Sequence, residues 1–249
     1  MVADAGRVKD PERVRSARIR RMNLLAIDTS TVSCSVAASR GRALYARSEP
    51  ALQHQAEKVL GMIEELLAQA QLGVDQIEGI AYGAGPGSFT GLRIAAGVTQ
   101  GLALARGIGV LGVGSLLSLA QQAAGESGAE KVIACIDAHM GEVYHAAYVR
   151  AGEAWEEIHA PGLCKPDAVP VPPGRDWIAC GDGFAAHRDR LAARLGERVF
   201  AVRPDASPSA RAVLQLAMPR FAAGEAKDAA TAVPVYLRDK VAQKTSERA

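Results

Sequence analysis

The sequence has few aromatic side chains, no large excess of positive or negative charge, and no closely spaced pair of cysteines. Phe, Trp and Tyr make up 4% of it, and the net charge of +2 at pH 7 is too small to indicate nucleic-acid binding by itself. Its four cysteines, Cys34, Cys135, Cys164 and Cys180, lack CxxC or metal-type spacing, which favours small core residues in a reducing compartment. No apolar run approaches the ~18 residues of a membrane span, and none has the form of a signal peptide. We therefore expect a cytoplasmic protein with no membrane contact.

What the chain does contain is apolar residues (49%) and 25 glycines among 249 residues. Such a chain can bury one large or two small cores, and its small side chains suit closely packed α/β layers. Residues 1–21 differ from the rest, because seven Arg or Lys there accompany only three Asp or Glu. We expect these residues to form a disordered basic extension, with attraction to RNA as the alternative.

Residues 82–106, YGAGPGSFTGLRIAAGVTQGLALAR, predict the end of a strand, a glycine-rich loop and a long helix. The loop residues are Gly83, Gly85, Pro86 and Gly87. Ser88 or Thr90 can cap the helix. Gly97 and Gly101 lie one turn apart within it, and each costs a helix roughly 1 kcal/mol relative to alanine. This cost indicates that another backbone approaches closely at these positions.

A glycine-rich loop between a strand and a helix can also hold a phosphate with its amides. This loop matches neither GxxxxGK[ST] nor GxGxxG, and no lysine follows the glycines. The pattern therefore favours a structural or partner-binding turn.

Residues 24–28, LLAID, predict a buried strand that ends in an acid, and residues 33–38 and 43–47 predict two more strands. The first turn of this meander contains three hydroxyl residues, Thr29, Ser30 and Thr31. With Asp28 they could hold a phosphate or a metal-bound water. Hydroxyl groups in turns more commonly satisfy their own backbone.

The remaining pattern predicts strands at 78–82, 110–113, 176–180 and 199–202, and helices at 55–71, 115–124, 185–195 and 209–223. Five prolines between residues 155 and 175 indicate an irregular excursion. Pro219 is expected to end or kink the last helix, which Ser207 or Ser209 can cap. His54 is interpreted as a cap or surface group, because no second histidine lies within a turn of it.

Residues 132–148, VIACIDAHMGEVYHAAY, repeat the pattern of LLAIDTSTVSCSVAA about a hundred residues later. Ile136 and Asp137 align with Ile27 and Asp28, and residues 146–147 align with 37–38. Both copies read as strand, acidic turn, strand. They predict duplicated domains whose turns face a shared cleft.

Four segments together resemble the TsaB (YeaZ) family, which takes part in making threonylcarbamoyladenosine in tRNA. They are LLAIDTS, GAGPGSFTGLRIAAGVTQGLALA, GVGSLLSLA and IDAHMGEVYHAAY, in the order expected over residues 22 to about 240. The resemblance implies a two-domain α/β protein of the actin-like ATPase (ASKHA, ribonuclease H-like) fold. The implied parts are an N-terminal subdomain at 22–125, a second at 126–206, and a C-terminal helix and tail at 207–249 with the helix packing back on the first.

The resemblance also implies that the chain is a non-catalytic paralogue of TsaD. TsaD-like proteins carry a metal-binding HxxxH after the central helix, and the matching residues here run from Val113 to Leu119. Ser115 and Leu119 stand at the two histidine positions. Neither can replace an imidazole ligand of iron or zinc, so we expect no metal site.

The function implied is a scaffold that binds TsaD as a heterodimer, with TsaE joining, and that meets tRNA only through the complex. Alone, the chain could pair with itself. The alternative is an ATP-dependent kinase or carbamoyl transferase of the same fold with Asp28 or Asp137 on magnesium; a metallopeptidase lacks its ligands here. No cofactor is expected, although a nucleotide could sit at the complex interface.

Two sets of residues follow from this hypothesis, and no catalytic residue is among them. The predicted partner interface consists of Val59, Met62, Ile63, Leu66, Gly91, Leu92, Ile94, Ala95, Gly97, Val98, Gly101 and Leu102. The candidate vestigial nucleotide cleft consists of Asp28, Thr29, Ser30, Thr31, Gly85, Gly87 and Asp137.

Overall fold

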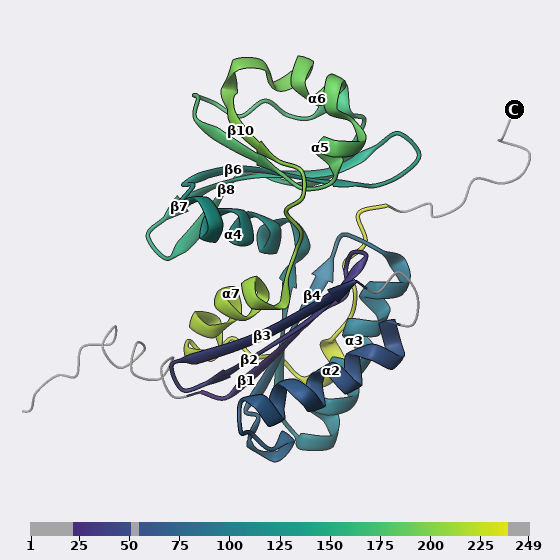
Figure 1. The fold of residues 1–249 in the computed structure, drawn as a ribbon, viewed down its shortest axis with the longest axis vertical. Helices are drawn as coiled ribbons and strands as arrows, with labels where there is room; N and C mark the ends of the chain where they lie inside the picture. Colours follow the sequence, from purple (N-terminus) through teal and green to yellow (C-terminus); the bar gives the residue numbers. More distant parts are fainter. Residues whose placement is uncertain (1–21, 51–54, 239–249) are drawn as a thin grey trace, which may run out of the picture.

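The computed structural model describes residues 22–50 and 55–238, which form two lobes stacked along the long axis of the molecule (Figure 1). The predictions for residues 1–21, for His54 and for the end of the tail lie outside these residues. Within the described part of the chain, no helix is both long and apolar enough to cross a membrane.

The first lobe is built on a five-stranded sheet in the order β3-β2-β1-β4-β5. Its strands are β1 Leu24–Asp28, β2 Ser33–Arg40, β3 Ala43–Pro50, β4 Gly79–Gly85 and β5 Gly109–Gly114. The first three form an antiparallel meander, whereas β4 and β5 run parallel to β1. Helices α2 (Gln55–Gln69) and α3 (Phe89–Arg106) cover one face, and α7 (Ala210–Ala222) covers the other.

The second lobe repeats this plan with the sheet order β10-β9-β6-β7-β8. Its strands are β6 Lys131–Asp137, β7 Val143–Ala151, β8 Ala154–Cys164, β9 Trp177–Cys180 and β10 Val199–Arg203. Helix α4 (Ser115–Ser127) packs on one face, and α5 (Gly183–Ala186) and α6 (Arg188–Leu195) pack on the other. Short 3-10 turns lie at Val74–Gln76, Pro166–Ala168, Gly196–Arg198 and Ala229–Thr231.

The two sheets confirm the duplication that the sequence predicts, because β1 to β5 and β6 to β10 follow the same order and directions. The predicted alignment is wrong by one residue in the second strand. Leu25 pairs with Ala38, and its counterpart Ala134 pairs with Ala146, so Ala38 rather than Ala37 corresponds to Ala146. Asp28 pairs with Ser35, seven positions on, whereas its counterpart Asp137 pairs with Val143, six positions on, so the segment between the paired residues is one residue shorter in the second copy.

Three other predictions need correction. Part of the irregular excursion is the edge strand β8, whose pairing with β7 shifts register near Pro161; a proline is tolerated at such an irregular edge. The helix predicted at 185–195 is interrupted at His187, which separates α5 from α6. Pro219 does not end α7, which continues to Ala222.

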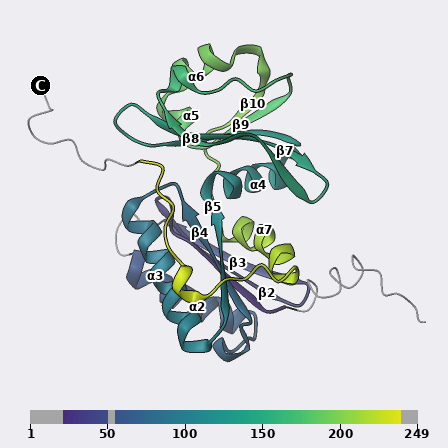
Figure 2. The same ribbon diagram turned by 180° about the vertical axis from the view of Figure 1, so that it is seen from behind.

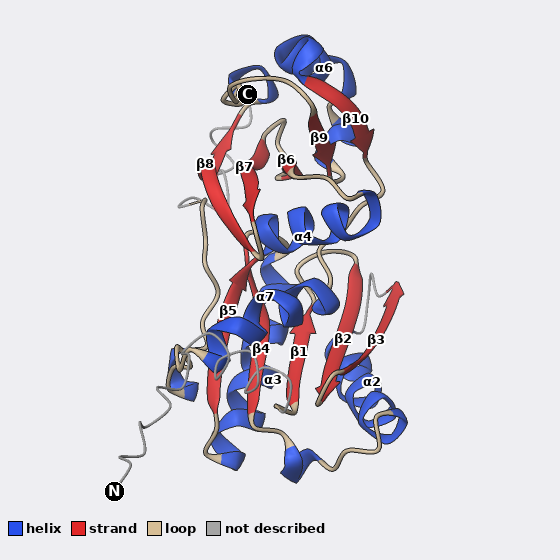
Figure 3. Cartoon of the chain, turned by 90° about the vertical axis from the view of Figure 1, so that its left-hand side faces the viewer, coloured by secondary structure: helices blue, strands red, loops and turns tan. Residues whose placement is uncertain are grey.

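Helices α4 and α7 lie between the two sheets and join the lobes (Figure 3). The amide of Gln121 on α4 donates to Gln215 on α7 at 3.1 Å, and the Ser209 hydroxyl donates to Gln122 at 2.7 Å. Ser209 also caps α7 by accepting from the Ala212 amide. A domain boundary at residue 125 would assign α4 to the first lobe, but its apolar side packs on β6 of the second.

Candidate functional site

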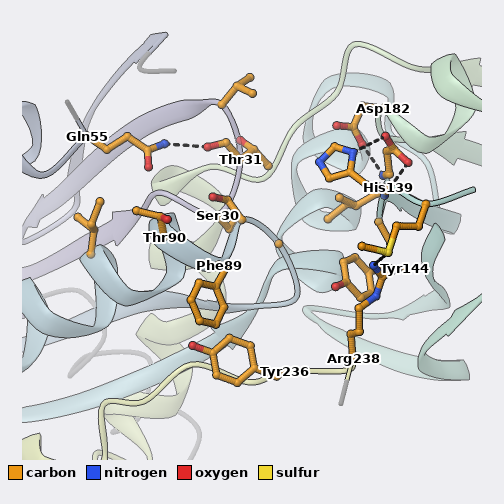
Figure 4. Close-up of a pocket in the computed structure, with 18 of the residues that line it drawn as sticks. Ser30, Thr31, Gln55, Phe89, Thr90, His139, Tyr144, Asp182, Tyr236 and Arg238 are labelled. Atoms are coloured by element: carbon orange, nitrogen blue, oxygen red, sulfur yellow. Dashed lines mark hydrogen bonds and ion pairs between the residues drawn. The ribbon is translucent and has the colours of Figure 1, made fainter. Parts of the chain in front are cut away.

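An open cleft of about 780 Å3 lies between the lobes on the side where β1, β6 and the glycine-rich loop end (Figure 4). The first lobe contributes Ser30, Thr31, Gln55, Gly87, Phe89 and Thr90. The second contributes Asp137, His139, Tyr144 and Asp182. Tyr236 and Arg238 from the end of the described chain complete the wall. The cleft therefore draws on three parts of the sequence that lie far apart.

The glycine-rich loop is packed against the turn that follows β1. A Cβ atom at Gly87 would overlap the carbonyl oxygen of Ser30, and one at Gly91 would overlap that of Thr29, both well inside the 3.0 Å that real Cβ atoms keep. The Ser88 amide donates to the Ser30 carbonyl at 2.7 Å, and the Thr29 hydroxyl donates to the Gly91 carbonyl at 2.6 Å. These glycines are thus required by a close approach within the chain.

The start of α3 is capped as the sequence predicts. The Ser88 hydroxyl accepts a hydrogen bond from the Gly91 amide at 3.3 Å. Gly83 and Gly85, predicted as part of the loop, belong instead to the end of β4. Two amides of the glycine-rich segment, those of Ser88 and Gly91, therefore bond to atoms of this chain.

Asp28 is buried beneath the turn and does not line the cleft. Its Oδ1 accepts from the amide and the hydroxyl of Ser30, at 2.9 and 2.7 Å. Its Oδ2 has no hydrogen-bond partner, and a Cβ atom at Gly83 would overlap it. Burial raises the pKa of Asp28 above its ordinary value, against the opposing effect of the Ser30 bonds. The carboxyl is therefore placed to hold the turn in shape.

The wall of the second lobe is richer in titratable groups. Oδ2 of Asp137 lies 3.1 Å from Nδ1 of His139, and Oδ1 lies 3.3 Å from Nε2 of His187. The Asp137 amide donates to Asp182 at 2.9 Å. The pKa of Asp182 is raised, first by desolvation and then by the like charge of Asp137. Of the two acids predicted for the cleft, only Asp137 faces it.

Sequence reasoning missed His139, Asp182 and His187. A signal for Asp182 was present, because it lies two residues after the end of β9. Strand β9 is the parallel neighbour of β6, which ends in Asp137. The carboxyl ends of neighbouring parallel strands meet at one edge of a sheet. Tyr236 and Arg238 carried no such signal, since they belong to no strand or helix.

Comparison with known proteins places this architecture in a family. The model for "TsaD: tRNA N6-adenosine threonylcarbamoyltransferase" matches residues 48–246. The Escherichia coli tRNA threonylcarbamoyladenosine biosynthesis protein TsaB is 37% identical over 90% of this chain and 97% of its own length. The chain belongs to the TsaB family. The Haemophilus influenzae TsaB is 36% identical to this chain over 98% of its own length. The structure titled YeaZ from Pseudomonas aeruginosa superposes on this chain with a TM-score of 0.82 at 39% identity. That superposition covers 87% of this chain and all of the other.

The TsaB family membership agrees with the actin-like fold, which the duplicated sheets display. At the two positions where TsaD-like proteins are expected to carry histidines, Ser115 and Leu119 are fully buried at the start of α4. Leu119 packs in the core between α4 and the second sheet. Among the residues that the structure describes, no three His, Cys, Asp or Glu side chains are grouped to hold a metal ion.

The structure brings only part of the predicted nucleotide cleft together. Ser30, Thr31, Gly87 and Asp137 line the cleft. Asp28 and Thr29 are buried behind it, and Gly85, with a φ of +116°, faces the carbonyl oxygen of Val235.

The predicted partner interface also needs correction, because much of it lies inside the first lobe. The buried members are Val59, Met62, Ile63, Leu66, Gly91, Leu92 and Ala95. All except Gly91 and Leu92 belong to the apolar cluster between the helices and the sheet. Leu92 is buried as well, and Gly91 is packed against the Thr29 carbonyl, so these are core residues of this chain. Gly97 and Gly101 are exposed with open space around them, and Ile94, Val98 and Leu102 are half-buried. Only this second group remains available to a partner.

Proposed function

We propose that the chain is a non-catalytic subunit that binds TsaD, and with TsaE supports threonylcarbamoyl transfer to the tRNA adenosine next to the anticodon. In this proposal it acts in the cytoplasm, without a membrane, and meets tRNA only through the complex. The observation that carries the proposal is the pair of buried residues Ser115 and Leu119 in a chain that otherwise matches TsaB proteins over nearly their whole length. A hydroxyl and an isobutyl group offer a metal ion no imidazole ligand.

The packing of the glycine-rich loop supports the same proposal. In a phosphate site, loop amides point at the ligand. Here the Ser88 amide bonds to the Ser30 carbonyl and the Gly91 amide bonds to the Ser88 hydroxyl. The loop is therefore used to hold the first lobe together.

The partner surface that we propose is the outward face of α3 and the neighbouring part of α2. Gly97 and Gly101 on α3, and Gly61 on α2, each have no atom within 4 Å of an added Cβ. Leu60 and Leu104 are large apolar side chains exposed on the same two helices, at 49% and 60%. A glycine inside a helix costs the helix stability, and the close approach of a partner backbone would offset that cost. Covering exposed leucines removes apolar surface from water, which favours association.

Sedimentation of the chain with TsaD from the same organism tests this proposal. Gly97→Leu and Gly101→Leu are expected to stay folded, because the space around both residues is open. They should weaken both the heterodimer and any homodimer. Gly125→Leu is the matched control, since Gly125 is also an exposed helical glycine with nothing within 4 Å, but on α4. Unchanged association of the α3 variants would place the interface elsewhere.

The alternative of an ATP-dependent kinase or carbamoyl transferase draws on the cleft itself, which is open and has Asp137 and hydroxyl groups on its walls. Incubation of the chain alone with ATP and magnesium, followed by measurement of the ADP released, separates the two. The scaffold proposal predicts no turnover by the chain alone. Turnover that is lost on Asp137→Ala would support the alternative.

A further inference from the structure

The C-terminal residues 233–238, here called the strap, leave the first lobe and reach the second beside the cleft. In Figure 2 this segment is the yellow chain that passes α3 toward the upper lobe. Its first half is fixed to β4: the Tyr82 hydroxyl donates to the Val233 carbonyl at 3.1 Å and accepts from the Val233 amide at 3.0 Å. The Val235 amide donates to the Ala84 carbonyl at 2.7 Å. The strap thus uses its own backbone groups for all three of these hydrogen bonds, two to the Tyr82 side chain and one to the β4 backbone.

The next contact of the strap is with the start of α3. The ring of Tyr236 lies 5.5 Å from that of Phe89, and its hydroxyl accepts from Nε of Arg93 at 3.0 Å. The Arg93 guanidinium in turn lies 3.8 Å above the Phe89 ring. Phe89 and Tyr236 line the cleft on the side of the first lobe, where their rings face each other (Figure 4).

The far end of the strap reaches the second lobe through one side chain. Nη2 of Arg238 donates to Oε2 of Glu142 at 2.6 Å, and Nη1 lies 3.2 Å from the sulfur of Met140. The Arg238 side chain is 14% exposed, so the pair is better shielded than a surface ion pair. Both contacts fall in the β6–β7 turn, where His139, Met140 and Gly141 all have φ between 55° and 75°.

We propose that the strap links the two lobes and limits how far the cleft between them opens. The ion pair between Arg238 and Glu142 is the contact that breaks when the cleft opens further. The attachment is unequal: three hydrogen bonds of the strap's own backbone and the Tyr236 ring hold it to the first lobe, whereas within the described residues its hydrogen bonds to the second lobe all come from the Arg238 side chain. Strain between the lobes therefore breaks the Arg238 contact first. The α4–α7 contact then acts as the hinge on the other side of the cleft.

The test measures the distance between the lobes in the full chain. Spin labels at Glu64→Cys on α2 and Arg188→Cys on α6 report it, because both residues are exposed and lie in different lobes. Cys164→Ser removes the one half-buried thiol, and the other three cysteines are buried. Labelled chains are mixed with an excess of unlabelled chain, so that only distances within one molecule are recorded by pulsed dipolar spectroscopy.

Arg238→Glu and Glu142→Arg should each broaden the distance distribution and shift its mean to longer values. The double variant, which exchanges the two charges, should restore the narrow distribution. Arg190→Gln is the control, because Arg190 pairs with Asp167 within the second lobe. Circular dichroism and Arg238→Gln guard against misfolding of the charge reversals. An unchanged distribution in the single variants, or a double variant as broad as either, would overturn the proposal.

Discussion

Replacing Gly91 with alanine should destabilise the first lobe, whereas the same change at Gly97 should not. Both glycines lie in α3, six residues apart, so the two substitutions add the same methyl group to one helix. At Gly91 the new Cβ would overlap the carbonyl oxygen of Thr29, which is backbone and buried. At Gly97 it would meet nothing within 4 Å.

The magnitude follows from two opposing effects. Alanine stabilises a helix interior by roughly 1 kcal/mol relative to glycine. Overpacking a well-filled site costs about 1 to 3 kcal/mol. Gly97→Ala should therefore raise the free energy of unfolding by up to about 1 kcal/mol, and Gly91→Ala should lower it by about 1 to 3 kcal/mol because the first turn gains little from helix propensity. The two variants should thus differ by about 1 to 4 kcal/mol, which at ~2 to 4 °C per kcal/mol for a chain of this size is a difference in melting temperature of roughly 2 to 16 °C.

Differential scanning calorimetry on the two variants and the unchanged chain measures this difference directly. Hydrogen exchange at the Ser88 amide, which bonds to the Ser30 carbonyl, would locate the damage. If Gly91→Ala melts at the same temperature as Gly97→Ala, the turn after β1 does not press on the glycine-rich loop. The loop would then have room for a ligand such as a phosphate, and the argument from packing would be refuted.

Three further predictions concern polar groups that are buried or half-buried. Burial raises the pKa of Asp28 above its ordinary value of 3.8, so the stability that the protonated carboxyl contributes is lost as pH rises from there through the folded-state pKa. The melting temperature of Asp28→Asn should therefore rise relative to that of the unchanged chain as pH increases above 3.8, and a difference that does not change with pH would contradict this. Burial and His159 lower the pKa of His145 from 6.5, so stability should fall as pH drops below about 6.5, and His145→Gln should flatten that fall. Ser209→Ala removes the α7 cap and a bond to Gln122, which should cost about 1 to 2 kcal/mol in urea unfolding; no loss would show that the cap is dispensable.

The duplicated sheets were predictable because each copy carries its own signal: an apolar strand, an acid, a polar turn and a second strand. The strand register of the second copy was not predictable. The segment between the paired residues Asp137 and Val143 is one residue shorter than that between Asp28 and Ser35, and this difference leaves the apolar pattern of both strands intact. Strand β8 was missed because it contains Pro161 and is followed by four more prolines before residue 175. An edge strand with a register shift needs fewer backbone donors than a central one, so Pro161 is compatible with it.

The two sides of α3 could not be told apart from the sequence, because small and large apolar residues surround the helix on every side. Leu92 and Ala95 face the core, while Gly97, Gly101 and Leu104 face outward. Periodicity locates a buried face only where polar residues mark the opposite one. The strap escaped prediction for a different reason, since its place beside the cleft depends on how the whole chain returns to β4.

Reconstitution of the modified tRNA tests the central claim most directly. TsaD, TsaE and this chain from one organism are combined with the threonylcarbamoyl donor, ATP and tRNA, each subunit is omitted in turn, and threonylcarbamoyladenosine is measured by mass spectrometry of the digested tRNA. We predict product only in the full mixture, and no product from this chain without TsaD. Product formed by this chain without TsaD, or equal product formed without this chain, would contradict the scaffold account.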